Sequence, residues 1–92
     1  GITVDSHNGN ASITMNTVTA GTAGTGKGIH VSASDDSWVF GNTVSNFNYG
    51  IHNNGSNLTG ISDNLLTNNT VGVRVNPSSS VTVELLSLYT SD

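Results

Sequence analysis

Apolar positions recur along this chain at a fixed distance. A glycine followed by an aliphatic residue begins a segment at Gly28, Gly50 and Gly72, with steps of 50 − 28 = 22 and 72 − 50 = 22, and Gly1 begins the same element earlier. Inside each segment apolar and polar residues alternate, as in residues 29–31, which is typical of short β-strands. No window has apolar residues at helical spacing over the ten or more residues that a helix needs.

A second motif keeps the same period. The run Asn42-Thr43-Val44 is followed by a similar run from Asn64, with 64 − 42 = 22, and is preceded by one from Asn16, with 42 − 16 = 26. Two independent motifs with one period indicate a solenoid in which each period is one turn. The sequence therefore predicts an all-β fold over residues 1–92, as one domain of about four stacked coils.

The repeated Asn-x-Val and Gly-Ile-x-Val runs, as in residues 42–44 and 28–31, resemble those of the right-handed parallel β-helix. That family of pectate-lyase-like proteins includes polysaccharide lyases, uronan epimerases, periplasmic NosD-like proteins and phage tailspikes. The resemblance covers nearly the whole chain. It implies a single-stranded solenoid and a location outside the cell, on its surface or on a virion, with the periplasm as the alternative. One such scaffold hosts many activities, so the resemblance implies no particular reaction.

The alternation assigns one set of aliphatic residues to the interior: Ile2, Val4, Ile13, Val18, Ile29, Val31, Val39, Val44, Ile51, Ile61, Leu66, Val73, Val75, Val83 and Leu88. Asn53 falls in the same column as three of these valines, so its amide must be hydrogen-bonded or the coil must bulge there. This core is small for the chain that it must order, and no polar terminal cap is recognisable. We therefore expect an uncapped fragment that continues into flanking β-helix coils or into a homo-oligomer.

Charged residues make up only 9% of the chain, against about 25% in ordinary globular proteins. Stacking explains the deficit, because a charge repeated in every coil would lie ~4.8 Å from its copy and repel it. Asparagine, serine and threonine fill the turns instead. Asn16, Asn42 and Asn64 either form a ladder of amides from coil to coil or serve only as turn residues.

Net charge and hydropathy exclude several classes of partner. The net charge is −4, and Lys27 and Arg74 are the only fixed cations, which argues against a nucleic-acid groove. No apolar run approaches the ~20 residues that span a bilayer, so no membrane insertion is expected. The absence of cysteine excludes disulfides and thiolate metal sites.

Two motifs suggest chemistry that their context does not support. Residues 21–27 have the spacing of a phosphate-binding loop, but position 28 is glycine and a strand pattern follows where a helix is needed. Asp35 and Asp36 could act as acid and base or bind calcium, but a turn also favours aspartate. Asp63 lies in another column, so no third acid is in register. We predict no catalytic residue, no metal site and no cofactor.

One polar column is the most site-like feature of the sequence. Thr3, His30, His52 and Arg74 share a register, and the alternation points them at solvent. Two imidazoles ~5 Å apart could share a metal, bind an anion together with the guanidinium, or hydrogen-bond a sugar. Only two histidines converge, because His7 lies elsewhere in its coil, so a metal set is incomplete. A solvated column without a ligand is the alternative.

Two further surfaces are suggested by apolar side chains. Trp38 and Tyr49 could stack on sugar rings, or they could belong to the core or an interface, whereas Phe47 is expected to cover a corner. With the column above, the predicted carbohydrate contacts are Trp38, Tyr49, His30, His52 and Arg74. The last segment carries Leu85, Leu86 and Tyr89 beyond what the interior needs, which predicts an assembly surface.

These features favour a non-catalytic structural or carbohydrate-binding segment of an extracellular, periplasmic or viral β-helix protein, with a polysaccharide or glycan as its ligand. One alternative is a portion of a polysaccharide lyase, hydrolase or epimerase. The Asp-Pro-x-x-x-His-Asp run of uronan epimerases and the Gly-His-Gly run of polygalacturonases are absent. Another alternative is a subunit that stacks end to end or trimerises into a fibre.

Overall fold

The computed structural model describes residues 1–6, 11–57, 60–76, 89 and 90, and every regular element among them is a β-strand. The strands are β1 (Ile2–Asp5), β2 (Ser12–Thr14), β3 (Thr17–Thr19), β4 (Lys27–Ser32), β5 (Trp38–Phe40), β6 (Thr43–Ser45), β7 (Tyr49–Asn54), β8 (Gly60–Ser62), β9 (Leu65–Thr67), β10 (Val71–Val75) and β11 (Tyr89–Thr90). The predicted all-β class is confirmed. A helix suited to crossing a membrane is absent from these residues.

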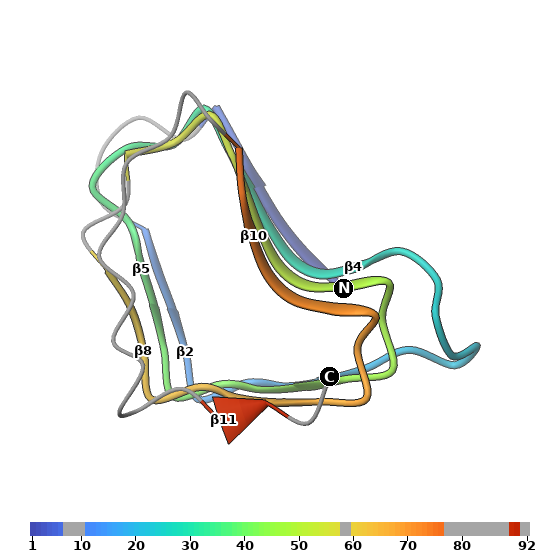
Figure 1. Cartoon of the computed structure of the whole chain (residues 1–92). Coiled ribbons are helices and arrows are strands. Elements are labelled where there is room, and N and C mark those ends of the chain that lie inside the picture. Colours follow the sequence, from blue (N-terminus) through green and yellow to red (C-terminus); the bar gives the residue numbers. More distant parts are fainter. Residues whose placement is uncertain (7–10, 58–59, 77–88, 91–92) are drawn as a thin grey trace.

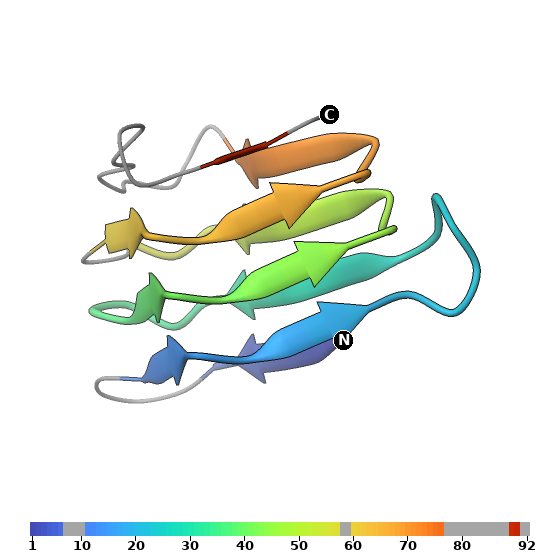
Figure 2. The ribbon, with the colours of Figure 1, turned by 90° about the horizontal axis from the view of Figure 1, so that it is seen from below.

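The strands form three parallel sheets. Sheet A has the order β1-β4-β7-β10, sheet B the order β2-β5-β8, and sheet C the order β11-β9-β6-β3. Each strand pairs with the corresponding strand of the next coil, and all the pairs are parallel. The coils therefore lie one above another (Figure 2), which confirms the predicted parallel β-helix.

The register follows the period read from the sequence. Ile29 pairs with Ile51 across sheet A, and Val44 pairs with Leu66 across sheet C. The first coil is longer because the loop of residues 20–26 projects from the stack between β3 and β4 (Figure 1). The Gly24 N–H donates to the Asn46 carbonyl of the next coil at 2.8 Å. β4 begins directly after this loop, so a strand and not a helix follows the residues with phosphate-loop spacing, as the sequence predicted.

The interior is a narrow aliphatic column. Its buried members are Ile13, Ile29, Val31, Val39, Val44, Phe47, Ile51, Ile61 and Leu66, and Ile2, Val4, Val18 and Val73 pack against them while partly buried. Phe47 covers a corner, as expected. The prediction was wrong for Val75, which is 37% exposed, because β10 is the outermost strand of sheet A. Val83 and Leu88 lie outside the described residues.

Buried amides line one corner of the coil. The Asn42 Oδ1 accepts hydrogen bonds from the backbone N–H and the Nδ2 of Asn16, both at 3.0 Å. Asn64 repeats the arrangement one coil later, with its Oδ1 accepting from the Asn42 backbone N–H at 2.9 Å and from the Asn42 Nδ2 at 3.0 Å. The ladder is therefore present, and the simpler interpretation of these residues as turn formers alone was incomplete.

Other polar residues also serve the corners. The inward amide of Asn53 is satisfied locally, since its Nδ2 donates to the Ser56 carbonyl at 2.7 Å and its Oδ1 accepts from the Ser56 N–H at 3.1 Å. Asp35 Oδ1 accepts from the Asn57 N–H at 2.8 Å. Asp36 and Asp63 hold the left-handed φ values of 60° and 55°, which aspartate tolerates in turns. The turn interpretation of these acids agrees with this geometry.

Candidate ligand-binding site

Sheet A bends sharply at its glycines. A Cβ on Gly28 would lie 2.3 Å from Val44 Cγ1 and 2.6 Å from the Gly50 carbonyl oxygen, so only hydrogen fits on this inward side. Ile29 is buried as well, so two consecutive residues face the interior and the alternation shifts by one position. Lys27 and His30 therefore both lie on the outside, and the bend makes the outer face of the sheet concave (Figure 1).

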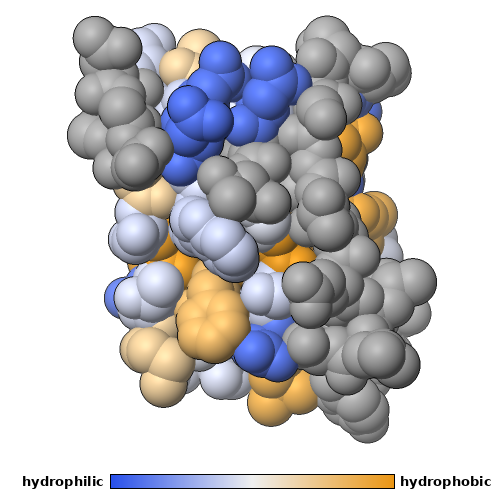
Figure 3. Space-filling model, turned by 90° about the vertical axis from the view of Figure 1, so that its left-hand side faces the viewer, coloured by the Kyte–Doolittle hydropathy of each residue, from blue (hydrophilic) through white to orange (hydrophobic). Residues whose placement is uncertain are grey.

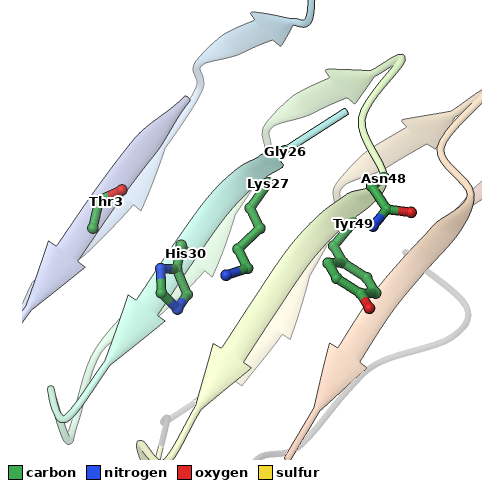
Figure 4. A pocket seen from close by; sticks show the side chains of 6 residues that line it. All are labelled: Thr3, Gly26, Lys27, His30, Asn48 and Tyr49. Atoms are coloured by element: carbon green, nitrogen blue, oxygen red, sulfur yellow. The ribbon is translucent and has the colours of Figure 1, made fainter. Parts of the chain in front are cut away.

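A cavity of about 500 Å³ lies on this face. Its lining residues are Thr3, Gly26, Lys27, His30, Asn48 and Tyr49. Figure 4 shows their side chains on one side of the sheet, contributed by β1, β4, β7 and the chain that leads into β4 and β7. The volume falls within the range of roughly 300–1,000 Å³ that is usual for small-ligand sites. The register of neighbouring coils thus converts separate sequence positions into one polar cavity.

The predicted histidine column is present and is partly covered. Thr3 pairs with His30, His30 with His52, and His52 with Arg74. The two imidazoles stack with centroids 5.1 Å apart and an interplanar angle of 22°. The expectation that the whole column faces solvent was wrong for His52, which is only 7% exposed. The Tyr49 ring packs against it with the centroids 5.3 Å apart, which alternation within one strand does not reveal.

Hydrogen bonding indicates which nitrogen of His52 carries the proton. The Asn76 Nδ2 donates to Asn54 Oδ1, which leaves Asn76 Oδ1 as an acceptor. It lies 3.0 Å from His52 Nε2, so in the neutral ring this nitrogen bears the hydrogen. The Nδ1 atom of His52 and the Nε2 atom of His30 are buried without a partner. The imidazole column thus retains hydrogen-bonding capacity that the described residues do not use.

Electrostatics near the cavity favour a neutral His30. Burial lowers the pKa of His30 below its ordinary value of 6.5, the charges of Lys27 and His52 lower it further, and Asp5 acts in the opposite direction. Desolvation penalises the charged imidazolium, and a nearby positive charge does the same. At neutral pH the fixed charge that lines the cavity is therefore the Lys27 ammonium.

Arg74 holds Tyr49 in place. Its Nη1 donates to the Tyr49 hydroxyl oxygen at 2.7 Å, and its guanidinium carbon lies 5.1 Å from the centroid of the ring. This combination of a hydrogen bond and a cation–π contact restricts the ring to one orientation. Because the hydroxyl oxygen accepts from arginine, its own hydrogen remains free to donate to a ligand.

The family model of the periplasmic copper-binding protein NosD matches residues 1–85 of the chain. The chain belongs to the NosD family. No curated protein and no solved structure matches it significantly. The NosD family is described as periplasmic, which agrees with the periplasmic alternative for its location and with the resemblance to β-helix proteins. Closer likeness to pectate lyases or tailspikes is not shown.

The copper named in the NosD description can be tested against the side chains. The lone pair of an imidazole nitrogen lies in the plane of its ring, so a metal bound by two imidazoles lies close to the planes of both rings. The stacked rings of His30 and His52 are nearly parallel, so their in-plane lone pairs do not converge. Among the described residues no group of three histidine, cysteine, aspartate or glutamate side chains could hold a metal ion, and His7 lies outside these residues. These residues do not fit a copper ion in this arrangement.

Trp38 belongs to a different face from the other predicted contacts. It lies on β5 in sheet B, is 43% exposed, and pairs in register with Ser12 and Gly60. Phe40, on the same strand, is 37% exposed. Figure 3 views the molecule from the side of Figure 1 on which sheet B lies, where hydrophobic and hydrophilic surface are mixed. The structure therefore brings together four of the five predicted carbohydrate contacts and separates Trp38.

Sequence reasoning missed Lys27, Gly26 and Asn48 as lining residues. A signal was present, because Lys27 precedes Gly28 as Tyr49 precedes Gly50, and the two pair in register. Strict alternation from Ile29 predicts that Lys27 points inward. Because Gly28 and Ile29 both face inward, Lys27 instead lies on the outer face, which alternation does not predict. Of the predicted assembly surface, Leu85 and Leu86 lie outside the described residues, and Tyr89 is described only as a backbone partner of Leu65.

Proposed function

We propose that this NosD-family chain is a non-catalytic β-helix segment of a periplasmic protein and that it binds a glycan on the concave outer face of sheet A. The observation that carries the proposal is the cavity in which His30 and Tyr49 meet Thr3, Lys27 and Asn48. The other two predicted contacts on sheet A, His52 and Arg74, lie next to the cavity and contact its lining residues. His52 stacks under His30, and Arg74 fixes Tyr49.

The chemistry of the lining suits a sugar. A sugar ring presents hydroxyl groups at its edge and C–H groups on its faces, so it needs hydrogen-bonding partners beside an aromatic surface. Thr3, Lys27 and Asn48 supply hydroxyl, ammonium and amide groups, and Tyr49 supplies the ring. Because these groups come from successive strands of one parallel sheet, their separations are set by backbone hydrogen bonds. Such preorganisation reduces the entropy that binding must overcome.

The non-catalytic part of the proposal is supported by how the described acids are used. Asp35 accepts a backbone N–H of the neighbouring coil. Asp36 and Asp63 occupy left-handed corner positions, and neither lines the cavity. Hydrolysis of a glycosidic bond usually needs a pair of carboxyl groups that flank the bond, and no aspartate or glutamate among the described residues lines the cavity. Asp5 is the nearest candidate by its influence on His30, and it also lies outside the lining.

A titration of the chain with a panel of neutral and acidic oligosaccharides tests the function. We expect binding that Tyr49→Ala weakens by about five- to tenfold, because the aromatic contact and the position of Arg74 are lost together. Trp38→Ala is the matched control, since it removes an exposed aromatic ring from sheet B and should leave affinity unchanged. Loss of binding in Trp38→Ala alone would place the site on sheet B. Absence of binding to every oligosaccharide would overturn the proposal.

A further inference from the structure

Positive charge is concentrated on the face that carries the cavity. Lys27 and Arg74 are the only lysine and arginine of the chain. They lie on β4 and β10, on either side of β7 in sheet A. The lining of the cavity includes the Lys27 ammonium and no carboxylate. Asp5 on β1 is the one acidic residue on the strands of this sheet, so with neutral histidines these strands carry 2 − 1 = +1 charge in a chain with a net charge of −4. This local excess of positive charge needs an explanation.

The longer first coil places the ammonium at this point. The loop of residues 20–26 ends at Gly26, whose φ of 65° is left-handed. Its carbonyl oxygen accepts the N–H groups of Asn48 and Tyr49, each at 3.1 Å. These bonds fix the end of the loop to the next coil and set Lys27 opposite Tyr49. In Figure 4 the lysine side chain lies between His30 and Tyr49.

The groups around the ammonium can donate hydrogen bonds, and the ammonium itself cannot accept one. Lysine can only donate, and the Tyr49 hydroxyl has a hydrogen to give because its oxygen already accepts from Arg74. The Thr3 hydroxyl and the amide nitrogen of Asn48 can donate from the other sides of the cavity. A ligand group that only accepts complements such a set. A carboxylate does so and also carries the charge that offsets the ammonium, in hydrogen bonds stronger than those between neutral groups.

We propose that the cavity binds the carboxylate of an acidic sugar and that Lys27 selects this group over its neutral counterparts. The inference rests on the proposed glycan-binding function and names its ligand class. Lys27 is then the specificity-determining residue, and the loop of residues 20–26 is the element that positions it. Tyr49 provides the surface for the sugar ring, whether the ring carries a carboxylate or not.

The test compares two ligands that differ only in charge. An oligoglucuronate and the same oligomer with its carboxylates converted to carboxamides are titrated into the chain by calorimetry at low salt. We expect the carboxylated oligomer to bind about tenfold more tightly, which is about 1.4 kcal/mol, because a hydrogen bond between two charged groups is stronger than one to a neutral amide. Lys27→Gln should remove this preference, whereas Lys27→Arg should keep most of it. Added salt should weaken it by screening.

A matched variant separates local from global charge. Thr14→Glu changes the net charge from −4 to −5, as Lys27→Gln does, but on the exposed outer face of β2 in sheet B. It should retain the tenfold preference. An equal loss of preference in both variants would show that only net charge acts and would overturn the role of Lys27. Lys27 is exposed, so thermal melting of its variants is expected to match that of the parent chain.

The remaining outcomes separate this inference from the function on which it rests. Equal binding of both oligomers by the parent chain would overturn the carboxylate preference and leave glycan binding intact. Binding of neither oligomer, together with no binding to the wider panel, would overturn both. Free acetate at the concentration of the oligomer is expected not to displace it. Displacement by acetate would show a site for small anions and would overturn the assignment to a sugar.

Discussion

Two polar columns run along the axis of this β-helix, and they differ in how they use their hydrogen-bonding groups. In the asparagine corner the central amide, that of Asn42, bonds to both its neighbours. Asn42 accepts from Asn16, donates to Asn64, and also donates to the Ile13 carbonyl at 2.9 Å. Asn64 donates in turn to the Val39 carbonyl at 3.0 Å. Both of these amides are 1% exposed, so nearly all of this bonding is internal.

The imidazole column has the same coil-to-coil spacing and a different outcome. His30 and His52 stack as neighbours, yet each retains a buried nitrogen without a partner. Imidazole has only two nitrogens in a rigid ring, so it cannot bond upward, downward and to the local backbone as an amide does. The comparison indicates that the asparagine column is satisfied from within and stabilises the fold, whereas the imidazole column keeps two buried nitrogens unpaired beside the cavity.

The largest effect is expected from breaking the asparagine ladder. Asn42→Ala removes the partners of Asn16, the Ile13 carbonyl and Asn64 at once, and it leaves buried groups unpaired. We expect a loss of about 3 kcal/mol or more in the free energy of unfolding, measured in urea. Asn16→Ala is the control, because this half-buried amide ends the described ladder and should lose only about 1 kcal/mol. Equal losses would contradict a cooperative ladder.

A smaller effect is expected from a substitution at the bend of sheet A. Gly28→Ala places a methyl group against Val44 and the Gly50 carbonyl, and overpacking of this kind costs about 1–3 kcal/mol. Glycan affinity should fall with stability, because Lys27 and His30 lie on either side of the glycine. Gly21→Ala is the matched control, since no atom lies within 4 Å of its added methyl group. An unchanged melting temperature in Gly28→Ala would refute the packing argument.

The third substitution tests the imidazole column directly. His52→Phe keeps a ring between His30 and Tyr49, gives up the bond to Asn76, and removes the unpaired Nδ1. The lost hydrogen bond lowers the free energy of unfolding and the removal of a buried unpaired nitrogen raises it, so we expect a net change of less than about 1 kcal/mol. The result should be compared with Asn42→Leu, which is also apolar and of similar size. A loss as large as that of the asparagine variant would erase the distinction between the columns.

The smallest effect is a pH dependence from His30. Its pKa is lower in the folded chain than the ordinary value of 6.5, through burial, Lys27 and His52, with Asp5 opposing. Above about 6.5 the imidazole is neutral in both states, and its contribution to stability is complete. As the pH falls below 6.5 the unfolded chain takes up the proton first, so stability decreases until the pH passes the lowered folded pKa.

Urea unfolding at a series of pH values from about 7.5 to 5 measures this contribution. His30→Gln keeps a polar side chain that does not titrate, so the difference between the two profiles isolates His30 from the carboxylates and from the other histidines. The profile of the variant should be flatter in this window. A variant with the same slope as the parent chain, or with a steeper one, would argue against a lowered pKa.

The sequence was sufficient to predict the stacked coils and their register. It was not sufficient to predict which side chains line the cavity on the outer face of sheet A. The spacing of Gly28, Gly50 and Asn42 from their repeats defined the register, because parallel coils must place equivalent residues above one another. Burial of His52 could not be predicted, since it depends on Tyr49, three residues away on the same strand, turning back over the imidazole. Lys27 was missed for a related reason. Gly28 and Ile29 both face inward at the bend, so the residues before them lie on the opposite side from the one that alternation predicts.

The seven-residue excursion before β4 has one more consequence. It leaves the stack after β3 and rejoins it at Gly26, and the strands of the coils that follow pair in regular parallel register. Loop length at such a position has little thermodynamic weight, since doubling it costs only about 0.6 kcal/mol. A loop of another length or sequence could therefore replace residues 20–26 and bring a different side chain to the cavity. Ligand specificity would then change while the repeats stay the same.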